Sequence, residues 1–154
     1  KIGARRKIFC FLYCSIKKMN LHKFNTNAPL IHVIRSLGMG DSGNCCLGTS
    51  QNGGSCCGVK FFHNCSGERR DQLAEVECNA WNTVYEGYSK EFVCYTVKGA
   101  EGLCLVMPYL DPIPKDERHR LLKTGKTQAV LRLFSKAGLM HCNVKWRLLG
   151  RFNG

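Results

Sequence analysis

The sequence predicts an α+β fold in which a five-stranded antiparallel sheet carries one long helix and is followed by further helical residues. Three strand-like runs separated by glycine-rich turns come first, a run with helical spacing follows, and two more strand-like runs complete the sheet. A chain of 154 residues has room for one core. Its 44% hydrophobic and 22% charged residues argue against disorder and against a polytopic membrane protein.

The first three strands are expected at residues 31–37, 44–48 and 56–62. The first run is rich in β-formers, and the loops at residues 38–43 and 51–54 are rich in glycine. Loops this short connect antiparallel neighbours. We therefore expect two consecutive hairpins.

Residues 68–85 have apolar side chains at three- and four-residue spacing, which is typical of a helix with one buried stripe. Two strand-like runs follow at residues 92–97 and 103–107, and residues 116–134 again have helical spacing, which ends at Gly138. The expected buried stripe of the first helix consists of Leu73, Val76, Ala80, Trp81 and Val84.

The net charge of +12 is unevenly distributed along the chain. Residues 1–18 carry six Lys or Arg and no acid, residues 19–114 carry seven against nine, and residues 115–154 carry ten against two. A basic end beside a near-neutral body favours a partner with phosphates, a phospholipid surface or an acidic protein, and ordinary solvated helix faces are the alternative. The cations near this end include Arg118, Arg120, Lys123, Lys126, Arg132 and Lys136.

The eleven cysteines contain no Cys-x-x-Cys motif, and four of them form the adjacent pairs 45–46 and 56–57. Zinc sites need short-spaced ligands that converge, so no metal is expected, and an odd count without a regular framework favours free thiols in a reducing compartment. We therefore expect an intracellular protein, cytoplasmic or nuclear.

Residues 1–30 are expected to be a basic segment that is disordered or not native to the domain. Its apolar run at residues 8–16 resembles the start of a signal peptide, but it lacks a cleavage site and is too short to span a bilayer. No transmembrane segment is expected elsewhere. A piece of a disrupted coding region is a further interpretation of the whole chain.

A Gly-x-Gly-x-x-Gly motif, formed by Gly38, Gly40 and Gly43, lies between the first two expected strands. Glycines in such a loop let the backbone approach nucleotide phosphates, although the motif alone also fits hairpin glycines. Lys60 follows on the third strand, seventeen residues beyond Gly43. A dinucleotide-binding fold would require the glycines between a strand and a helix, so their position favours a different nucleotide site.

On these motifs the chain resembles a protein kinase. The resemblance implies a kinase-like small lobe and hinge at residues 31–110, and the first helical part of the large lobe at residues 111–154. It also implies that the glycine loop and Lys60 bind ATP, with Lys60 at the α- and β-phosphates.

A kinase pairs this lysine with a carboxylate on the following helix, where Glu77 and Glu75 both qualify. The two lie about 200° apart around a helix, so only one of them can face the strand. We favour Glu77, because Trp81, Val84 and Leu73 then share its side of the helix.

Residues 103–110 resemble the kinase strand that leads into the hinge. The resemblance places Met107 at the gatekeeper position and implies that the carbonyl of Pro108 and the amide of Leu110 meet the adenine edge. A buried strand before a proline loop is the simpler alternative.

Residues 139–146 match the spacing of the kinase catalytic loop, with His141, Asn143 and Lys145 at its characteristic positions. Asn143 stands where the family has the aspartate that accepts the substrate proton, and an amide cannot act as this base. Leu148 replaces the asparagine that binds the second Mg²⁺. With no Asp-Phe-Gly in the sequence, we expect ATP binding with weak or absent Mg²⁺ and a loss of phosphoryl transfer to Ser or Thr.

The expected protein is thus a pseudokinase or an inactive piece of one, with an unknown protein partner. Trp146 and Arg147 also resemble residues of the divergent kinase-like domains of Crinkler-type effectors. An alternative function is a basic nucleic-acid or effector-type interaction module that binds through residues 115–151, although aromatic side chains for base stacking are sparse there.

Overall fold

The chain forms two compact units, of which the larger is Tyr13–Tyr109 and the smaller combines Lys1–Leu12 with Leu110–Gly154. The computed structural model describes residues 7–10, 31–40, 42–50, 56–63, 65–86, 89–139 and 149–152.

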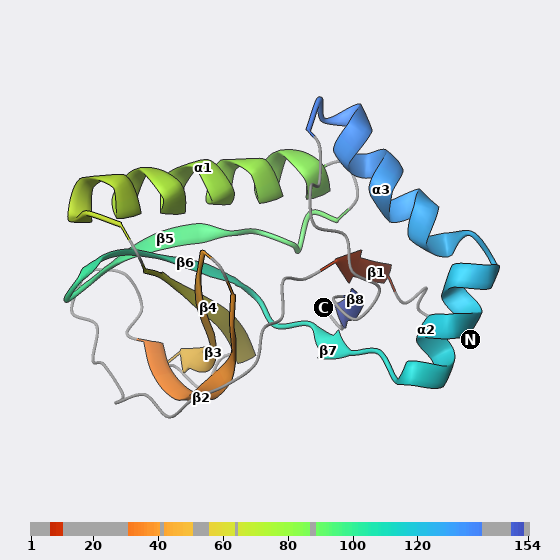
Figure 1. Cartoon of the computed structure of the whole chain (residues 1–154), viewed down its shortest axis with the longest axis horizontal. Coiled ribbons are helices and arrows are strands. Elements are labelled where there is room, and N and C mark those ends of the chain that lie inside the picture. Colours follow the sequence, from red (N-terminus) through yellow and green to blue (C-terminus); the bar gives the residue numbers. More distant parts are fainter. Residues whose placement is uncertain are drawn as a thin grey trace. The chain divides into compact units, whose positions relative to one another are not determined.

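The larger unit contains a five-stranded antiparallel sheet in the order β2-β3-β4-β6-β5 (Figure 1). β2, β3 and β4 pair consecutively as antiparallel neighbours, and β6 pairs with β4 after the helix. The predicted α+β fold with this sheet is confirmed. The strands are β2 (Ile31–Met39), β3 (Gly43–Ser50), β4 (Cys56–Phe62), β5 (Tyr95–Gly99) and β6 (Gly102–Pro108).

Helix α1 (Gly67–Tyr85) packs on this sheet, mainly against β6 (Figure 1). The predicted stripe is right at Trp81 and Val84 but wrong at Leu73 and Val76, whose side chains are exposed. The small side chains Ala74 and Cys78 face the sheet instead, and Val76 lies about 200° around the helix from Ala74. The buried residues of α1 are Ala74, Cys78, Trp81, Val84 and Tyr85.

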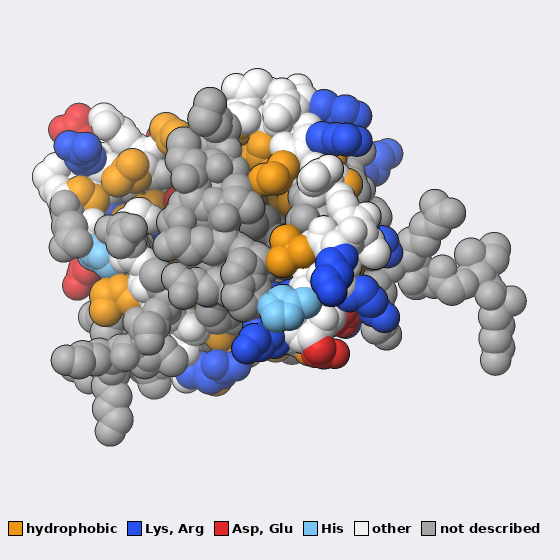
Figure 2. All heavy atoms as spheres, turned by 45° about the vertical axis from the view of Figure 1, so that its right-hand side comes forward, with side chains coloured by type: hydrophobic (Ala, Val, Ile, Leu, Met, Phe, Trp, Pro, Cys, Tyr) orange, Lys and Arg blue, Asp and Glu red, His pale blue; other side chains and the backbone are white. Residues whose placement is uncertain are grey.

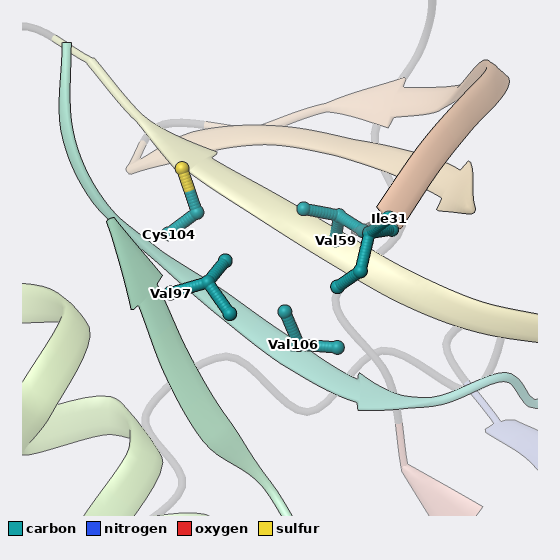
Figure 3. Packing of buried hydrophobic residues seen from close by; sticks show 5 residues of the cluster. All are labelled: Ile31, Val59, Val97, Cys104 and Val106. Atoms are coloured by element: carbon teal, nitrogen blue, oxygen red, sulfur yellow. The ribbon is translucent and has the colours of Figure 1, made fainter. Parts of the chain in front are cut away.

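An apolar cluster covers the sheet face opposite to Lys60. Because side chains alternate along a strand, Val59 points away from the face that carries Lys60. Figure 3 shows Val59 packed with side chains contributed by β2, β5 and β6. This cluster leaves the other face free to carry α1 and the polar residues described below. It consists of Ile31, Val59, Val97, Cys104 and Val106.

The smaller unit has a three-stranded antiparallel sheet in the order β1-β8-β7 and two helices. The sequence predicted none of these short strands, because their partners are far apart in the chain and have no shared periodicity. At Gly150 a Cβ would lie 2.6 Å from Cβ of Leu110, so β8 requires a glycine there. The elements are β1 (Lys7–Cys10), β7 (Asp111–Pro112), β8 (Leu149–Phe152), α2 (Lys115–Lys123) and α3 (Lys126–Lys136).

The helical run predicted at residues 116–134 is divided in two. Gly125 has a φ of +69°, a left-handed conformation that ends α2 and precedes α3. Leu121 of α2 and both Val130 and Phe134 of α3 are buried. The two helices therefore each have an apolar side, whereas Lys123, Gln128 and Arg132 are exposed.

Candidate functional site

A partly buried ion pair joins the sheet to the helix in the larger unit. Nζ of Lys60 on β4 lies 2.6 Å from Oε2 of Glu77 on α1, and the two side chains are 4% and 22% exposed. Lys60 pairs across the sheet with Leu105 of β6, the strand against which α1 packs, so the register brings the lysine under the helix. Glu75 is exposed, and Glu77 is the carboxylate that meets Lys60.

Both charged groups have a second contact. Nε1 of Trp81 donates a hydrogen bond of 3.3 Å to Oε1 of Glu77, one helical turn away. Nζ of Lys60 lies 4.7 Å from the ring centroid of Phe62, within the range of a cation–π interaction. The carboxylate therefore has a donor on each oxygen, and the ammonium faces a carboxylate and an aromatic ring. Such additional contacts are what a buried ion pair needs to offset its desolvation.

The glycine loop lies at the tip of the β2–β3 hairpin, next to this ion pair. The amide of Gly40 donates a hydrogen bond of 2.7 Å to the carbonyl of Gly43, which closes the loop. A Cβ at Gly43 would clash with the carbonyl oxygen of Phe61 and would lie 3.3 Å from Cε of Lys60. The end of the glycine loop and the lysine are therefore neighbours, and Gly43 is required there by backbone packing.

A side-chain hydrogen bond also joins the two strands of this hairpin, β2 and β3. The hydroxyl of Ser36 donates a hydrogen bond of 3.1 Å to Oδ1 of Asn44, which is one of the few buried polar residues described. Gly38 pairs with Cys45 beyond a register shift in β2. The shift bends the strand just before the loop. Ser36 and Asn44 thus hold the hairpin that presents the glycines.

Helix α1 is attached near its start to the β5–β6 hairpin. Oδ1 of Asp71 accepts a hydrogen bond of 2.6 Å from the amide of Leu103, and its Oδ2 lies 3.3 Å from Nζ of Lys98. The Leu103 amide, with Lys98 adding to it, holds the pKa of Asp71 below its usual range. Arg70 donates to the carbonyl of Glu101 in the same turn.

A second attachment lies near the end of α1. The side-chain amide of Asn82 donates a hydrogen bond of 2.8 Å to the carbonyl of Cys94 and accepts one of 2.7 Å from its amide. The strand predicted at residues 92–97 begins only at Tyr95, since the backbone groups of Cys94 are bonded to this side chain. Trp81 stacks on Tyr85, whose ring in turn contacts Phe92.

The predicted hinge residues fall in two different units. Met107 is buried on β6 opposite Gly58, and by register it shares its face of the sheet with Lys60. Pro108 is half-buried at the end of β6. Leu110 is buried in the smaller unit, beside Gly150.

The predicted catalytic-loop residues His141, Asn143 and Lys145 lie outside the described residues, as does Leu148. Within the described ranges, no group of three or more His, Cys, Asp or Glu side chains is arranged to hold a metal ion. Of the residues predicted for the nucleotide site, the structure brings together Lys60, Glu77 and Gly43.

Sequence reasoning missed the residues that support the ion pair. Trp81 belongs to the predicted buried stripe, but its hydrogen bond to Glu77 was not predicted. Its position four residues after Glu77 could have indicated that the indole N–H would reach the carboxylate. The role of Asn82 had no comparable signal, because its partner, the backbone of Cys94, belongs to an irregular segment.

Eight cysteines in the described part of the chain are free thiols. Burial raises the pKa of Cys104 to about 12, and burial together with neighbouring Cys56 raises that of Cys57 to about 11. Burial also raises the pKa of Cys94. These thiols are poor nucleophiles at neutral pH, whereas Cys56 is exposed.

Helices with the length and apolar character needed to cross a membrane are absent from the described residues. The fold is similar to that of the PknI kinase domain from Mycobacterium tuberculosis, with a TM-score of 0.53 and 16% sequence identity. The match covers 84% of this chain and 57% of that domain, so the chain spans little more than half of its structural relative. At this identity the likeness establishes a kinase-like fold.

No curated protein matches the sequence. A family model described as "Family of unknown function (DUF5898)" matches residues 36–152, which include the end of β2, the other four strands of the five-stranded sheet, α1 and both later helices. The chain therefore belongs to this family of unknown function, and it has a kinase-like fold.

Proposed function

We propose that the larger unit is a nucleotide-binding domain that takes ATP between the glycine loop and Lys60. The observation that carries this proposal is the 2.6 Å pair of Lys60 and Glu77, because a fixed ammonium is the group that a kinase-like fold offers to the α- and β-phosphates. Gly43 carries less weight, since packing against Phe61 requires glycine there in any case.

The test is nucleotide-dependent thermal stability. ATP at about ten times its Kd should raise the Tm by about 3–6 °C, because it binds only the folded state. Lys60→Ala should abolish this rise, whereas Lys98→Ala, which removes another lysine paired with α1, should keep it. An unchanged Tm of the wild-type protein with millimolar ATP and with ADP would contradict the proposal.

Loss of the ion pair can itself unfold the domain, so a second variant is needed. Replacing Lys60 by Met together with Glu77 by Leu removes both charges and fills their space with apolar atoms, which is often tolerated. This double variant should fold and should not respond to ATP. A response equal to that of the wild type would show that nucleotide binds elsewhere.

We further propose that phosphoryl transfer is lost in this chain. Asn143 cannot accept the proton of a substrate hydroxyl, and the side chain of Leu148 offers no oxygen to a metal ion. The protein should therefore transfer no phosphate from ATP to a generic protein substrate, and Asn143→Asp alone should not restore transfer. Measurable phosphorylation that depends on Lys60 would contradict this assignment.

A second candidate function belongs to the smaller unit, in which α2 and α3 expose a surplus of cations. Figure 2 shows Lys and Arg side chains gathered over these helices, with few acidic side chains among them. A surface of this kind fits the phosphates of a nucleic acid. A gel shift that weakens steeply with salt would support it, and binding that is indifferent to salt would contradict it. The exposed cations are Lys115, Arg120, Lys123, Lys126, Arg132 and Lys136.

A further inference from the structure

Helix α1 is attached to the sheet side of the larger unit at two points, and Glu77 lies between them. Asp71, six residues before Glu77, accepts from the amide of Leu103 on β6. Asn82, five residues after Glu77, bonds both backbone groups of Cys94. Two such contacts fix both the position of the helix along its axis and its rotation about that axis. In the position that they fix, Glu77 meets Lys60.

The Asn82 contact is the more restrictive of the two. Its amide makes two hydrogen bonds, of 2.7 and 2.8 Å, to the amide and the carbonyl of one residue. A helix rises about 1.5 Å and turns about 100° per residue. A shift of α1 by a single residue would therefore break both bonds and leave the part-buried backbone groups of Cys94 without these partners, which is costly.

The orientation of the carboxylate is fixed separately. Trp81, next to Asn82 in the sequence, donates to Oε1 of Glu77 and leaves Oε2 for Lys60. The ring of Trp81 is itself held by stacking on Tyr85. Asn82 thus sets the helix, and Trp81 selects the direction in which the Glu77 carboxylate points.

We propose that Asn82 is a positioning residue for the Lys60–Glu77 pair, holding α1 against Cys94 so that the pair is formed without any ligand. The pairing itself does not depend on ATP, and only its use in binding ATP rests on the proposed function. In this arrangement the contacts of Asn82 and Asp71 already hold the helix at the lysine site, and a partner or modification is not required to bring it there.

The experiment measures how fast Lys60 is acylated by acetic anhydride, using mass spectrometry and the exposed Lys98 as the internal reference. Lys60 should react slowly in the wild type, since its side chain is 4% exposed. Asn82→Ala should speed its acylation by about thirtyfold, the change in an opening equilibrium that the loss of two ordinary hydrogen bonds produces. The matched control is Asn79→Ala, which removes an exposed asparagine from the same helix and should leave the rate unchanged.

Two further readouts separate positioning from general destabilisation. Hydrogen exchange of the β4 backbone amides reports global unfolding, and it should change less than the acylation of Lys60 does. The indole N–H resonance of Trp81 should move in Asn82→Ala, because its carboxylate acceptor shifts with the helix. Asn82→Asp keeps the acceptor for the Cys94 amide and should give an intermediate rate of acylation.

Equal acylation of Lys60 in Asn82→Ala and in the wild type would overturn the proposal. So would faster acylation matched by equally faster exchange in β4, or the same acceleration in Asn79→Ala. If ATP fails to stabilise the wild type while acylation of Lys60 still follows Asn82, the proposed nucleotide function fails and the positioning role stands.

Discussion

Charged side chains have different surroundings in the two units. Residues 31–110 carry six Lys or Arg and eight Asp or Glu, and around α1 the two kinds meet across neighbouring elements. Residues 115–136 carry seven Lys or Arg and only two acids, of which Glu117 contacts both Arg120 and Arg151. The cross-element pairs around α1 are Lys60–Glu77, Arg70–Glu101 and Lys98–Asp71.

This difference indicates which charges maintain the fold and which can serve a partner. Removal of a cation that is buried against a carboxylate leaves the carboxylate charged and unpaired in a weakly polar environment, which lowers the free energy of unfolding. An exposed cation without enough acids around it adds little to stability and raises the local positive potential. The α1 region should therefore respond to charge changes through stability, and α2–α3 through binding.

The largest expected effect is that of Glu77→Ala. The substitution leaves Lys60 buried and without its carboxylate, so the free energy of unfolding should fall by about 3–5 kcal/mol. Urea unfolding followed by circular dichroism measures this change. Replacing both charges with Met and Leu should recover most of it. A loss below about 1 kcal/mol for Glu77→Ala would mean that the pair behaves as a surface ion pair and would remove the contrast between the units.

A somewhat smaller loss is expected for Gly43→Ala. The new Cβ would clash with the carbonyl oxygen of Phe61, and forcing β3 away from β4 should cost about 1–3 kcal/mol. The matched control is Gly67→Ala at the start of α1, where no atom lies within 4 Å of the added Cβ. The control should keep or slightly raise stability. Equal stability of both variants would show that the glycine loop is looser than its packing indicates.

The β-sheet and the principal ion pair were predictable because their signals are local. Runs rich in β-formers and glycine-rich loops indicated the hairpins, and the spacing between Gly43 and Lys60 indicated a kinase-like strand. Only one of two residues lying 200° apart on a helix can face a strand, and Glu77 was favoured over Glu75 because apolar residues such as Trp81 share its side. Each of these inferences uses residues within one or two adjacent elements.

The parts that could not be predicted depend on contacts between distant or irregular segments. The pairing of β1 with β8 joins the two ends of the chain, and no periodicity in either segment indicates its partner. Leu73 and Val76 are exposed because Ala74 and Cys78 occupy the sheet side of α1. Hydrophobicity alone would place Leu73 and Val76 in the core ahead of these smaller side chains. Asn82 bonds to the backbone of Cys94, and every residue has these backbone groups, so the sequence does not indicate which residue Asn82 contacts.

A smaller, pH-dependent effect is expected at Asp71. Its pKa is lowered in the folded state, so its contribution to stability is present above its unfolded pKa of about 3.9 and is lost as the pH falls below that value. Asp71→Asn removes the titrating group, and its stability should depend less steeply on pH below about 4 than that of the wild type. Urea midpoints measured from pH 7 to pH 3 test this. Parallel curves would show that the contact with Leu103 does not favour the ionised form.

The smallest change in stability, and the most direct test of the α2–α3 surface, is expected for Lys126→Glu. Lys126 begins α3, whose first turn contains no acid, so a cation there opposes the helix dipole. The substitution should raise the free energy of unfolding by about 0.3–1 kcal/mol while weakening nucleic-acid binding. Lys136→Glu in the last turn makes the same change of charge but should lower stability by a similar amount, and it should weaken binding equally. Opposite effects on stability with the same loss of binding would separate the two roles of charge. Unchanged binding in both variants would show that these cations are only a solvated helix face.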